Sequence, residues 1–342
     1  MKKMFALLLS LIIVFSLCAC GANSSDPMKD DGSAEKNTSA YEEAGFVIAP
    51  KNGSKYVVGI VVKTVESVFY QNLANAVEDE YKDSDLFDII VQASQTEMDT
   101  TGFVQIIEDM VTKDVDLLIV VPGDPESVRP ALENAVANGI PVICSETDVP
   151  NLEGKLTYVG IDNVAAGKGI SSYLFSEGVL KAGDECALIT GPAGYTTTVD
   201  RAQGTRQGIE ENGGVVVAEQ PADWDRTKGM EVAENILTAN PNIKYLCCSN
   251  GEMALGAVEA VASAGKTGDV YITGFDGILD ELYAIEEGRM SGTALQDSRQ
   301  YSLLAMEKYI DYLKGNELEE FYDIGSPIIT PDEVPEYVNM WK

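Results

Sequence analysis

The chain has 342 residues, of which 45% are hydrophobic, so it is long enough for two domains that each bury an apolar core. Its 55 acidic and 24 basic residues give a formal net charge of −31, which argues against nucleic acid as a partner because neutralising phosphates requires clustered Lys and Arg. No histidine occurs, so the commonest general base and the commonest zinc ligand are both missing; we expect no metal site and no cofactor.

The N-terminus has the pattern of an export signal. Lys2 and Lys3 precede an apolar run, Met4–Leu17, which as a helix spans only about 21 Å, so a permanent membrane span is disfavoured. The run ends in Leu17-Cys18-Ala19-Cys20 and resembles a bacterial lipoprotein signal. We therefore predict a signal over residues 1–20, with Cys20 lipidated; an ordinary cleaved signal is the alternative.

Residues 21–54 are predicted to form a flexible tether, because most of this stretch is polar and rich in Ser, Asn, Asp, Lys and Gly. Beyond it, apolar runs rich in Val and Ile alternate with stretches of helical periodicity. The predicted strands are Tyr56–Val62, Phe87–Gln92, Leu117–Val121, Val142–Cys144, Leu156–Gly160, Cys186–Thr190, Val215–Gln220, Tyr245–Cys248 and Tyr271–Phe275. The predicted helices are Tyr70–Tyr81, Thr101–Thr112, Val128–Asn138, Ala165–Glu177, Arg201–Asn212, Thr227–Ala239 and Met253–Ala264.

Continuous apolar strands that alternate with helices predict parallel sheets covered on both faces. There are too many strands for one small sheet, so the predicted fold class is α/β, with two doubly wound parallel-sheet lobes joined by a multi-strand hinge. The N-terminal lobe is predicted to contain residues 55–161 and 297–325, and the C-terminal lobe residues 162–296 and 326–342. Residues 323–341 are Pro-rich and are predicted to be irregular, with short extended segments that cross back between the lobes.

Four cysteines beyond the leader lie in apolar runs that have the pattern of buried strands. Disulfides are one interpretation for an exported protein, but Cys144, Cys186, Cys247 and Cys248 show no framework spacing. The neighbours Cys247 and Cys248 are expected on opposite faces of one strand. Buried free thiols are therefore expected.

Aromatic side chains beyond two strands are candidates for a ligand pocket, because ligands of doubly wound sheets bind at the carboxyl ends of the strands. Phe69 and Tyr70 follow the first strand and its loop, and Trp224 lies in a polar stretch after the Val215–Gln220 strand. Their rings can cover the apolar faces of a sugar. For Phe69 and Tyr70 a place in the core is an equal alternative.

Polar side chains complete the candidate pocket. Glu146 and Asp276 each follow a strand and can accept hydrogen bonds from sugar hydroxyls, whereas a helix N-cap or turn is the alternative for Asp276 and for Asn250. Arg201 opens the helix predicted after the Gly191–Gly194 turn, and by itself it fits a surface charge. The turn lacks the Gly-Lys-Ser/Thr ending of a phosphate-binding loop, so we set that interpretation aside.

Three stretches together resemble the sugar-binding branch of the type I periplasmic binding proteins, close to the ribose-binding group. They are Gln220-Pro221-Ala222-Asp223-Trp224-Asp225-Arg226, Asn250-Gly251-Glu252-Met253-Ala254-Leu255-Gly256-Ala257 and Gly274-Phe275-Asp276-Gly277. The resemblance extends over about residues 56–325. It implies that Arg201, Trp224, Asn250, Asp276 and Gln296 occupy ligand positions of the family.

The first lobe departs from the family pattern. Glu146-Thr147 stands where the family commonly has an Asp-Arg pair, and Ser67 stands where an Asn is usual. Near the position of Val121 the family usually has a polar residue. Lys63 replaces a small polar residue, so the pocket keeps a positive charge at a different place. The predicted ligand residues of this lobe are Lys63, Ser67, Phe69, Tyr70, Glu146 and Thr147. A pentose other than ribose, a hexose or a polyol fits this altered half.

The resemblance implies the capture component of an ABC sugar importer, with a permease and an ATPase as partners and a lipid anchor at the outer face of the membrane. A sensory receptor that passes ligand occupancy to a signalling partner is the alternative. A glycosidase is disfavoured because Glu146 and Asp276 have no evident proton-transfer setting. A repressor of the same architecture needs a DNA-binding head, and this N-terminus has a signal and a tether instead. No chemical step is expected.

Overall fold

The computed structural model describes residues 40–53 and 55–340, and the leader with Cys20 lies outside them. A short helix, α1 (Ala40–Glu43), precedes the first sheet. In the described part of the chain the strands form two six-stranded sheets, with the orders β11-β5-β4-β3-β1-β2 and β12-β10-β9-β8-β6-β7. The predicted α/β class with two lobes of parallel sheet is confirmed.

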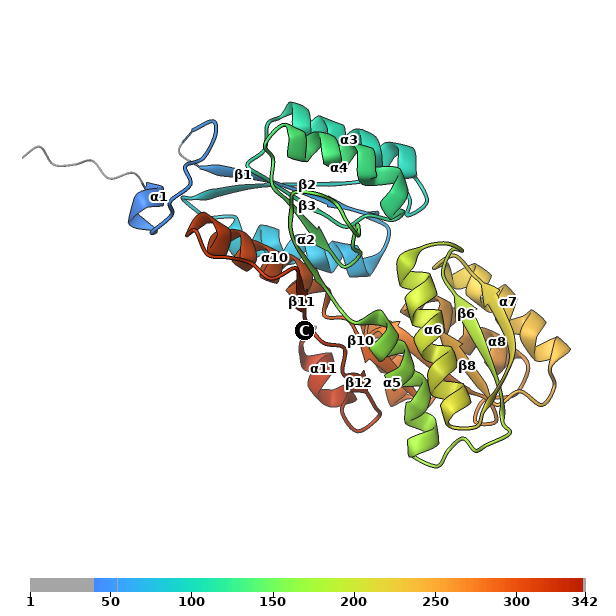
Figure 1. Ribbon diagram of the computed structural model, residues 1–342. Coiled ribbons are helices and arrows are strands. Elements are labelled where there is room, and N and C mark those ends of the chain that lie inside the picture. The colour runs from blue at the N-terminus through green and yellow to red at the C-terminus, as the bar shows by residue number, and fades with distance from the viewer. Residues whose placement is uncertain (1–39, 54, 341–342) are drawn as a thin grey trace, which may run out of the picture. The chain divides into compact units, whose positions relative to one another are not determined.

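The first sheet is parallel throughout and carries helices on both faces (Figure 1). Helices α3 and α4 cover one face, and α2 and α10 pack together on the other. Its strands are β1 (Tyr56–Val62), β2 (Phe87–Ala93), β3 (Leu117–Val120), β4 (Val142–Ser145), β5 (Lys155–Gly160) and β11 (Phe321–Asp323). Its helices are α2 (Val68–Tyr81), α3 (Thr100–Thr112), α4 (Pro125–Ala137) and α10 (Ser298–Leu313).

The second sheet repeats this plan, except that its edge strand β12 runs antiparallel to β10. Helices α5 and α6 pack against each other, and so do α7 and α8. Its strands are β6 (Glu185–Thr190), β7 (Val215–Pro221), β8 (Tyr245–Cys248), β9 (Tyr271–Asp276), β10 (Gly292–Leu295) and β12 (Ile328–Ile329). Its helices are α5 (Asn163–Ser176), α6 (Thr196–Glu211), α7 (Arg226–Ala239), α8 (Gly251–Ser263), α9 (Leu279–Glu286) and α11 (Val334–Met340).

The chain passes between the two sheets three times. It leaves the first sheet after β5, returns to it between β10 and α10, and leaves it again between β11 and β12. The chain around this last crossing supplies one short strand to each sheet, although β11 ends at Asp323, where the predicted Pro-rich stretch begins, and only β12 lies within that stretch. The prediction that this segment is otherwise irregular is wrong, because it also forms α11, which packs against α9.

Aspartate side-chain caps fix where five of the helices begin. Asp99, Asp124, Asp162, Asp225 and Asp297 each precede a helix and accept a backbone N–H of its first turn. Such caps satisfy donors that have no partner within the helix. The helices therefore start at fixed positions next to the ends of the strands, where the candidate site lies.

The start of α6 corrects one prediction. Arg201 does not open this helix but lies inside it, because the helix begins at Thr196. The preceding run Thr196-Thr197-Thr198-Val199 is β-branched and has a low intrinsic helix propensity. Thr197 and Thr198 are buried, so packing outweighs propensity there.

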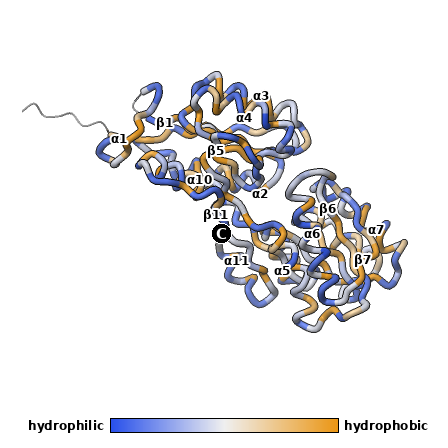
Figure 2. The backbone as a smooth tube through the Cα atoms, viewed as in Figure 1, coloured by the Kyte–Doolittle hydropathy of each residue, from blue (hydrophilic) through white to orange (hydrophobic). Residues whose placement is uncertain are grey.

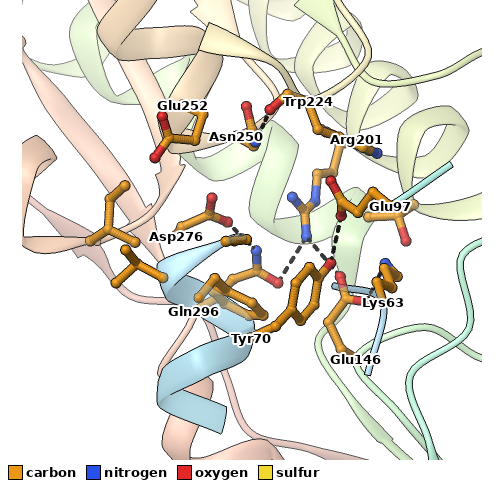
Figure 3. Close-up of a pocket in the computed structure, with 15 residues that line it drawn as sticks. Lys63, Tyr70, Glu97, Glu146, Arg201, Trp224, Asn250, Glu252, Asp276 and Gln296 are labelled. Atoms are coloured by element: carbon orange, nitrogen blue, oxygen red, sulfur yellow. Dashed lines mark hydrogen bonds and ion pairs between the residues drawn. The ribbon is translucent and has the colours of Figure 1, made fainter. Parts of the chain in front are cut away.

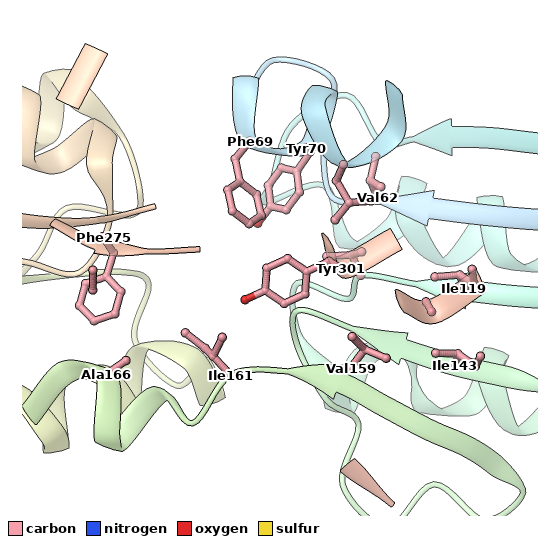
Figure 4. Packing of buried hydrophobic residues seen from close by; sticks show 14 of the residues in the cluster. Val62, Phe69, Tyr70, Ile119, Ile143, Val159, Ile161, Ala166, Phe275 and Tyr301 are labelled. Atoms are coloured by element: carbon pink, nitrogen blue, oxygen red, sulfur yellow. The ribbon is translucent and has the colours of Figure 1, made fainter. Parts of the chain in front are cut away.

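The core follows the alternation of apolar strands and amphipathic helices, which Figure 2 shows as hydrophobic strands among hydrophilic outer turns. One buried cluster contains residues of both sheets, such as Val62 and Phe275, together with Tyr301 of α10, and is shown in Figure 4. Cys247 belongs to this cluster, and Cys248 belongs to a second cluster on the other face of the same sheet. The four described cysteines are free and buried, as expected.

Candidate functional site

A pocket lies beyond the carboxyl ends of strands from both sheets. The first sheet contributes side chains that follow β1, β2 and β4, and the second contributes side chains at the ends of β6 to β10. This is the position expected for a ligand of doubly wound sheets. The lining residues are Lys63, Ser67, Val68, Phe69, Tyr70, Glu97, Glu146, Thr197, Arg201, Trp224, Asn250, Glu252, Asp276, Ile278 and Gln296 (Figure 3).

The pocket brings together every sequence-predicted ligand residue except Thr147. The hydroxyl of Thr147 instead donates a hydrogen bond to Glu146 at 2.6 Å and accepts one from Lys63 at 3.1 Å. It also lies 3.4 Å from the hydroxyl of Thr197, which belongs to α6. Thr147 therefore positions the charged groups of Lys63 and Glu146 without lining the pocket itself.

Lys63 and Glu146 form a buried ion pair in the wall of the pocket. The Lys63 ammonium lies 2.7 Å from the Glu146 carboxylate, and both side chains are 5% exposed. Burial by itself raises the pKa of Glu146, but Lys63 and Arg201 outweigh it and hold the pKa of this carboxyl below its usual value. The charge that Lys63 brings to the pocket is thus largely matched by Glu146.

Arg201 is a buried connector and not a surface charge. Its guanidinium donates hydrogen bonds of 2.8 Å each to the Asn163 side chain, the Ser249 carbonyl and the Gln296 side chain. It lies 4.0 Å from Glu146 and 4.6 Å from the centre of the Phe275 ring. Because it is 2% exposed and multiply bonded, Arg201 fixes the relative positions of several wall residues.

Asp276 occupies the end of β9 and joins two neighbouring loops. Its carboxylate accepts the Gly251 backbone N–H at 3.0 Å and the Gln296 amide at 2.7 Å. Burial raises the pKa of Asp276, against the lowering effect of Arg201 and of these hydrogen bonds. The residue adopts a φ of 94°, which is rare for a residue with a side chain and fixes the direction of the carboxylate into the pocket.

The N-cap interpretation of Asn250 is confirmed, and its role in ligand binding stays a prediction. It caps α8, since its side-chain oxygen accepts the Met253 N–H at 2.9 Å, and its side chain also lines the pocket. Its amide group donates to the carbonyl of Trp224 at 3.3 Å. The cap therefore positions the amide between the loops after β7 and β8.

The aromatic candidates come from opposite lobes. Phe69 and Tyr70 lie in the first turn of α2, are buried, and belong to the core as well as to the wall, so both interpretations hold. Trp224 has a φ of 63° and packs on Gly191, where an added Cβ would lie 2.0 Å from the ring. That close approach requires glycine at position 191. A sugar held between these rings stays a prediction.

Among the polar lining residues, sequence reasoning missed Glu97, Thr197 and Glu252, and it also missed the apolar Val68 and Ile278. Glu97 follows β2, where no motif marks it, and its position beyond a strand end was the one available signal. Thr197 lies in the β-branched start of α6, and Glu252 forms an ion pair with Arg226 at 2.7 Å. All three polar residues sit on segments whose local sequence resembles ordinary loops and helix starts.

Two further observations concern the residues that the structure describes. They contain no group of three or more His, Cys, Asp and Glu side chains arranged to hold a metal ion. None of the helices in this part of the chain has the length and apolar character needed to cross a membrane.

Comparison with known proteins gives a consistent result. Residues 58–317 match the periplasmic binding protein domain. The chain is 32% identical over 329 residues to the ribose import binding protein RbsB of Bacillus subtilis, covering 96% of this chain and 98% of that protein. By its name, this relative is a binding protein for ribose import.

Solved structures agree. An ABC transporter periplasmic solute binding protein from Actinobacillus succinogenes with bound D-allose has a TM-score of 0.77 and 29% identity, covering 83% of this chain and all (100%) of that one. A solute binding protein from Bacillus halodurans with bound myo-inositol has a TM-score of 0.76 and 26% identity, and the match covers 84% of this chain and 99% of that one.

Proposed function

The chain belongs to the periplasmic binding protein domain family, and from this premise we propose that it is the solute-binding component of an ABC sugar importer. It captures a monosaccharide or a polyol in the pocket between its two sheets and returns it unchanged. The partners are a permease and an ATPase. Export and attachment to the membrane by a lipid on Cys20 are part of the same proposal, based on the leader sequence.

The observation that carries the proposal is the composition of the pocket wall. Carboxylates and amides of Asp276, Asn250 and Gln296 lie beside the guanidinium of Arg201 and the ring of Trp224. Such a set accepts and donates hydrogen bonds around a ring of hydroxyls, while an indole covers the C–H face. A polyhydroxylated molecule matches this wall better than an apolar or a macromolecular ligand does.

Ligand capture requires closure of two lobes on one molecule. Lys63 and Glu146 belong to the first lobe, and Arg201 and Asp276 to the second, so a bound ligand bridges both. Bridging stabilises the closed form by the difference in ligand affinity between the two forms. A micromolar dissociation constant corresponds to about −8 kcal/mol, which a few charge-assisted hydrogen bonds of roughly 1.5–3 kcal/mol each supply after ordering costs.

The test is a ligand screen on the purified full chain. Thermal unfolding is measured with pentoses, hexoses and polyols, including D-ribose, D-allose and myo-inositol, and each hit is quantified by calorimetry. We expect at least one hit to raise the melting temperature and to be recovered chemically unchanged after incubation. Conversion of the ligand into a product, or no stabilisation by any member of the panel, would contradict the proposal.

A further inference from the structure

Glu97 is a carboxylate of the pocket with unused hydrogen-bonding capacity and no cation bonded to it. It follows β2, lines the pocket, and accepts a hydrogen bond from the Tyr70 hydroxyl at 2.9 Å (Figure 3). Within the described residues no further hydrogen bond and no ion pair joins its side chain. An ionised carboxylate offers about four acceptor sites, so most of this capacity is open toward the pocket.

The other charged groups of the wall are already engaged. Lys63 pairs with Glu146 at 2.7 Å, and Glu252 pairs with Arg226 at 2.7 Å. The two oxygens of Asp276 accept the Gly251 N–H and the Gln296 amide. In contrast to these groups, Glu97 faces the pocket with a neutral phenol as its bonded partner.

The charges around Glu97 favour a ligand that donates a hydrogen bond and disfavour an anionic ligand. Four carboxyl groups line the pocket against two cations, Lys63 and Arg201, which is a formal excess of two negative charges. Burial raises the pKa of Glu97; Lys63 and the Tyr70 hydrogen bond lower it, while Glu146 and Asp276 raise it further. A ligand carboxylate or phosphate would add repulsion to a site that already disfavours negative charge, whereas a hydroxyl donor stabilises the Glu97 carboxylate.

We propose that Glu97 is a specificity-determining residue of the pocket, which accepts a hydroxyl hydrogen bond from the ligand beside Tyr70 and rejects sugars or polyols that carry a carboxylate or a phosphate. This inference rests on the proposed function. It adds a side chain from the β2 loop to the ligand positions that the motifs indicate, and it names the class of sugar derivative that the pocket excludes.

The test compares matched neutral and anionic probes by calorimetry on the full chain. The probes are D-ribose with D-ribose 5-phosphate and myo-inositol with myo-inositol 1-phosphate. We expect the unmodified chain to bind at least one neutral probe at least about 100-fold more tightly than its phosphate, since the phosphate carries about one and a half to two negative charges at neutral pH and each is repelled by the carboxylate. Glu97→Gln should lower the affinity for the neutral probe about tenfold. It should also reduce the ratio of the neutral-probe affinity to the phosphate affinity at least tenfold.

Two further variants separate a role of Glu97 from a general effect of charge or folding. Glu66→Gln removes the same charge from an exposed side chain on the β1–α2 loop, and it should leave both affinities within about threefold. Tyr70→Phe removes the hydrogen bond to Glu97 but keeps the carboxylate, so it should weaken the neutral probe while the phosphate stays rejected.

The outcomes are distinguishable. If Glu97→Gln folds, binds the neutral probe as the unmodified chain does and rejects the phosphate equally, Glu97 has no such role. If Glu97→Gln fails to fold, unchanged affinities in Tyr70→Phe would overturn the inference. If the unmodified chain binds neither these probes nor any member of the wider sugar panel, the proposed function itself is contradicted, and the role of Glu97 falls with it.

Discussion

The polar residues of the pocket act on the ligand site and on the fold at the same time. Lys63 and Glu146 illustrate this, because two charges taken out of water are tolerated only as long as each compensates the other. Their pairing also explains why a lysine is compatible with a pocket for an uncharged molecule. The positive charge is balanced within the wall and needs no anionic ligand.

Lys63→Met tests this dependence. The substitution leaves the Glu146 carboxylate buried with Arg201, 4.0 Å away, as its nearest recorded cation, so we expect the free energy of unfolding to fall by about 3–5 kcal/mol. The matched control is Lys168→Met, which removes an exposed pair with Glu211 and should cost less than about 1 kcal/mol. Urea unfolding measures both. Equal losses of unfolding free energy in the two variants would show that the buried pair contributes no more to stability than the exposed pair does.

Asp276→Asn tests the polar end of β9. The substitution keeps the shape but removes the charge that orders the Gly251 N–H and the Gln296 amide, so we expect the affinity for the neutral ligand to fall more than tenfold. Calorimetry with the best hit of the sugar panel measures it. Asp280→Asn, at an exposed carboxylate of α9, serves as the control. Unchanged affinity in Asp276→Asn would remove this carboxylate from the ligand site.

At the residue scale, the sequence predicts which side chains lie at the pocket better than it predicts their hydrogen-bond partners. The aromatic, amide and charged candidates lie at strand ends, and the carboxyl ends of parallel strands converge, so their meeting in one pocket is predictable. The buried state of Arg201 is not, because its acceptors Asn163, Ser249 and Gln296 are distant in sequence. Glu97 escapes notice for the same reason, since its significance depends on Tyr70 and not on its own neighbours.

At the scale of elements, the strands of both sheets place the pocket, and close contacts between helix backbones set how the second lobe packs. Helices α5 and α6 pack closely where both carry glycines. A Cβ at Gly204 would lie 2.0 Å from the Val164 carbonyl oxygen, a backbone atom that cannot yield without moving α5. Because Asn163 at the start of α5 binds Arg201 in α6, this contact also positions the pocket wall.

Gly204→Ala is therefore expected to destabilise the protein in spite of the better helix propensity of alanine. Overpacking costs about 1–3 kcal/mol or more, against a gain of about 1 kcal/mol from propensity. Gly169→Ala in α5 is the control, since its Cβ would meet only Ile328 at an ordinary 3.6 Å, so this variant should be neutral or slightly stabilising. Thermal unfolding measures both, and a stable Gly204→Ala variant would contradict the tight backbone contact.

The pattern of elements was predictable wherever an apolar run was long and bounded by turns. The predicted elements do not include α1, α9, α10, α11, β10, β11 or β12. Of these, β10, β12 and α11 are short and owe their structure to partners in the sheet or to α9. The start of α6 at Thr196 was hidden because burial of its threonines outweighs their propensity. Elements that depend on tertiary contacts are the ones that local patterns miss.

At the scale of the whole molecule, the acidic composition affects the stability of the fold. Carboxyl groups are held inside the lobes as well as on the surface, and Glu281 is fully buried. Its carboxylate accepts the Gly277 and Ile278 N–H groups at 2.8 and 3.1 Å and the Thr293 hydroxyl at 2.9 Å, which fixes the turn after Asp276. The ligand site and the stability of the fold are thus connected through one buried acid.

The stability of the whole molecule should therefore depend on pH in a defined direction. Burial, followed by the charge of Asp276, raises the pKa of Glu281 well above its usual value, and the pKa of Asp276 and of Glu97 is also raised. A carboxyl whose folded pKa exceeds its unfolded value, about 4.3 for Glu, stabilises the fold below that unfolded value, and this contribution is lost as pH rises through the folded pKa. The lowered pKa of Glu146 acts in the opposite sense, below about pH 4.3.

We accordingly expect the free energy of unfolding to decrease as pH rises above the unfolded carboxyl pKa of about 4.3, and Glu281→Gln to reduce that slope because the amide cannot ionise. Urea unfolding at a series of pH values measures the slope for the unmodified chain and the variant. Glu66→Gln, which removes an exposed carboxylate, should leave it unchanged. A slope that is the same in Glu281→Gln as in the unmodified chain would mean that this buried acid binds its proton no more tightly in the folded state than in the unfolded one.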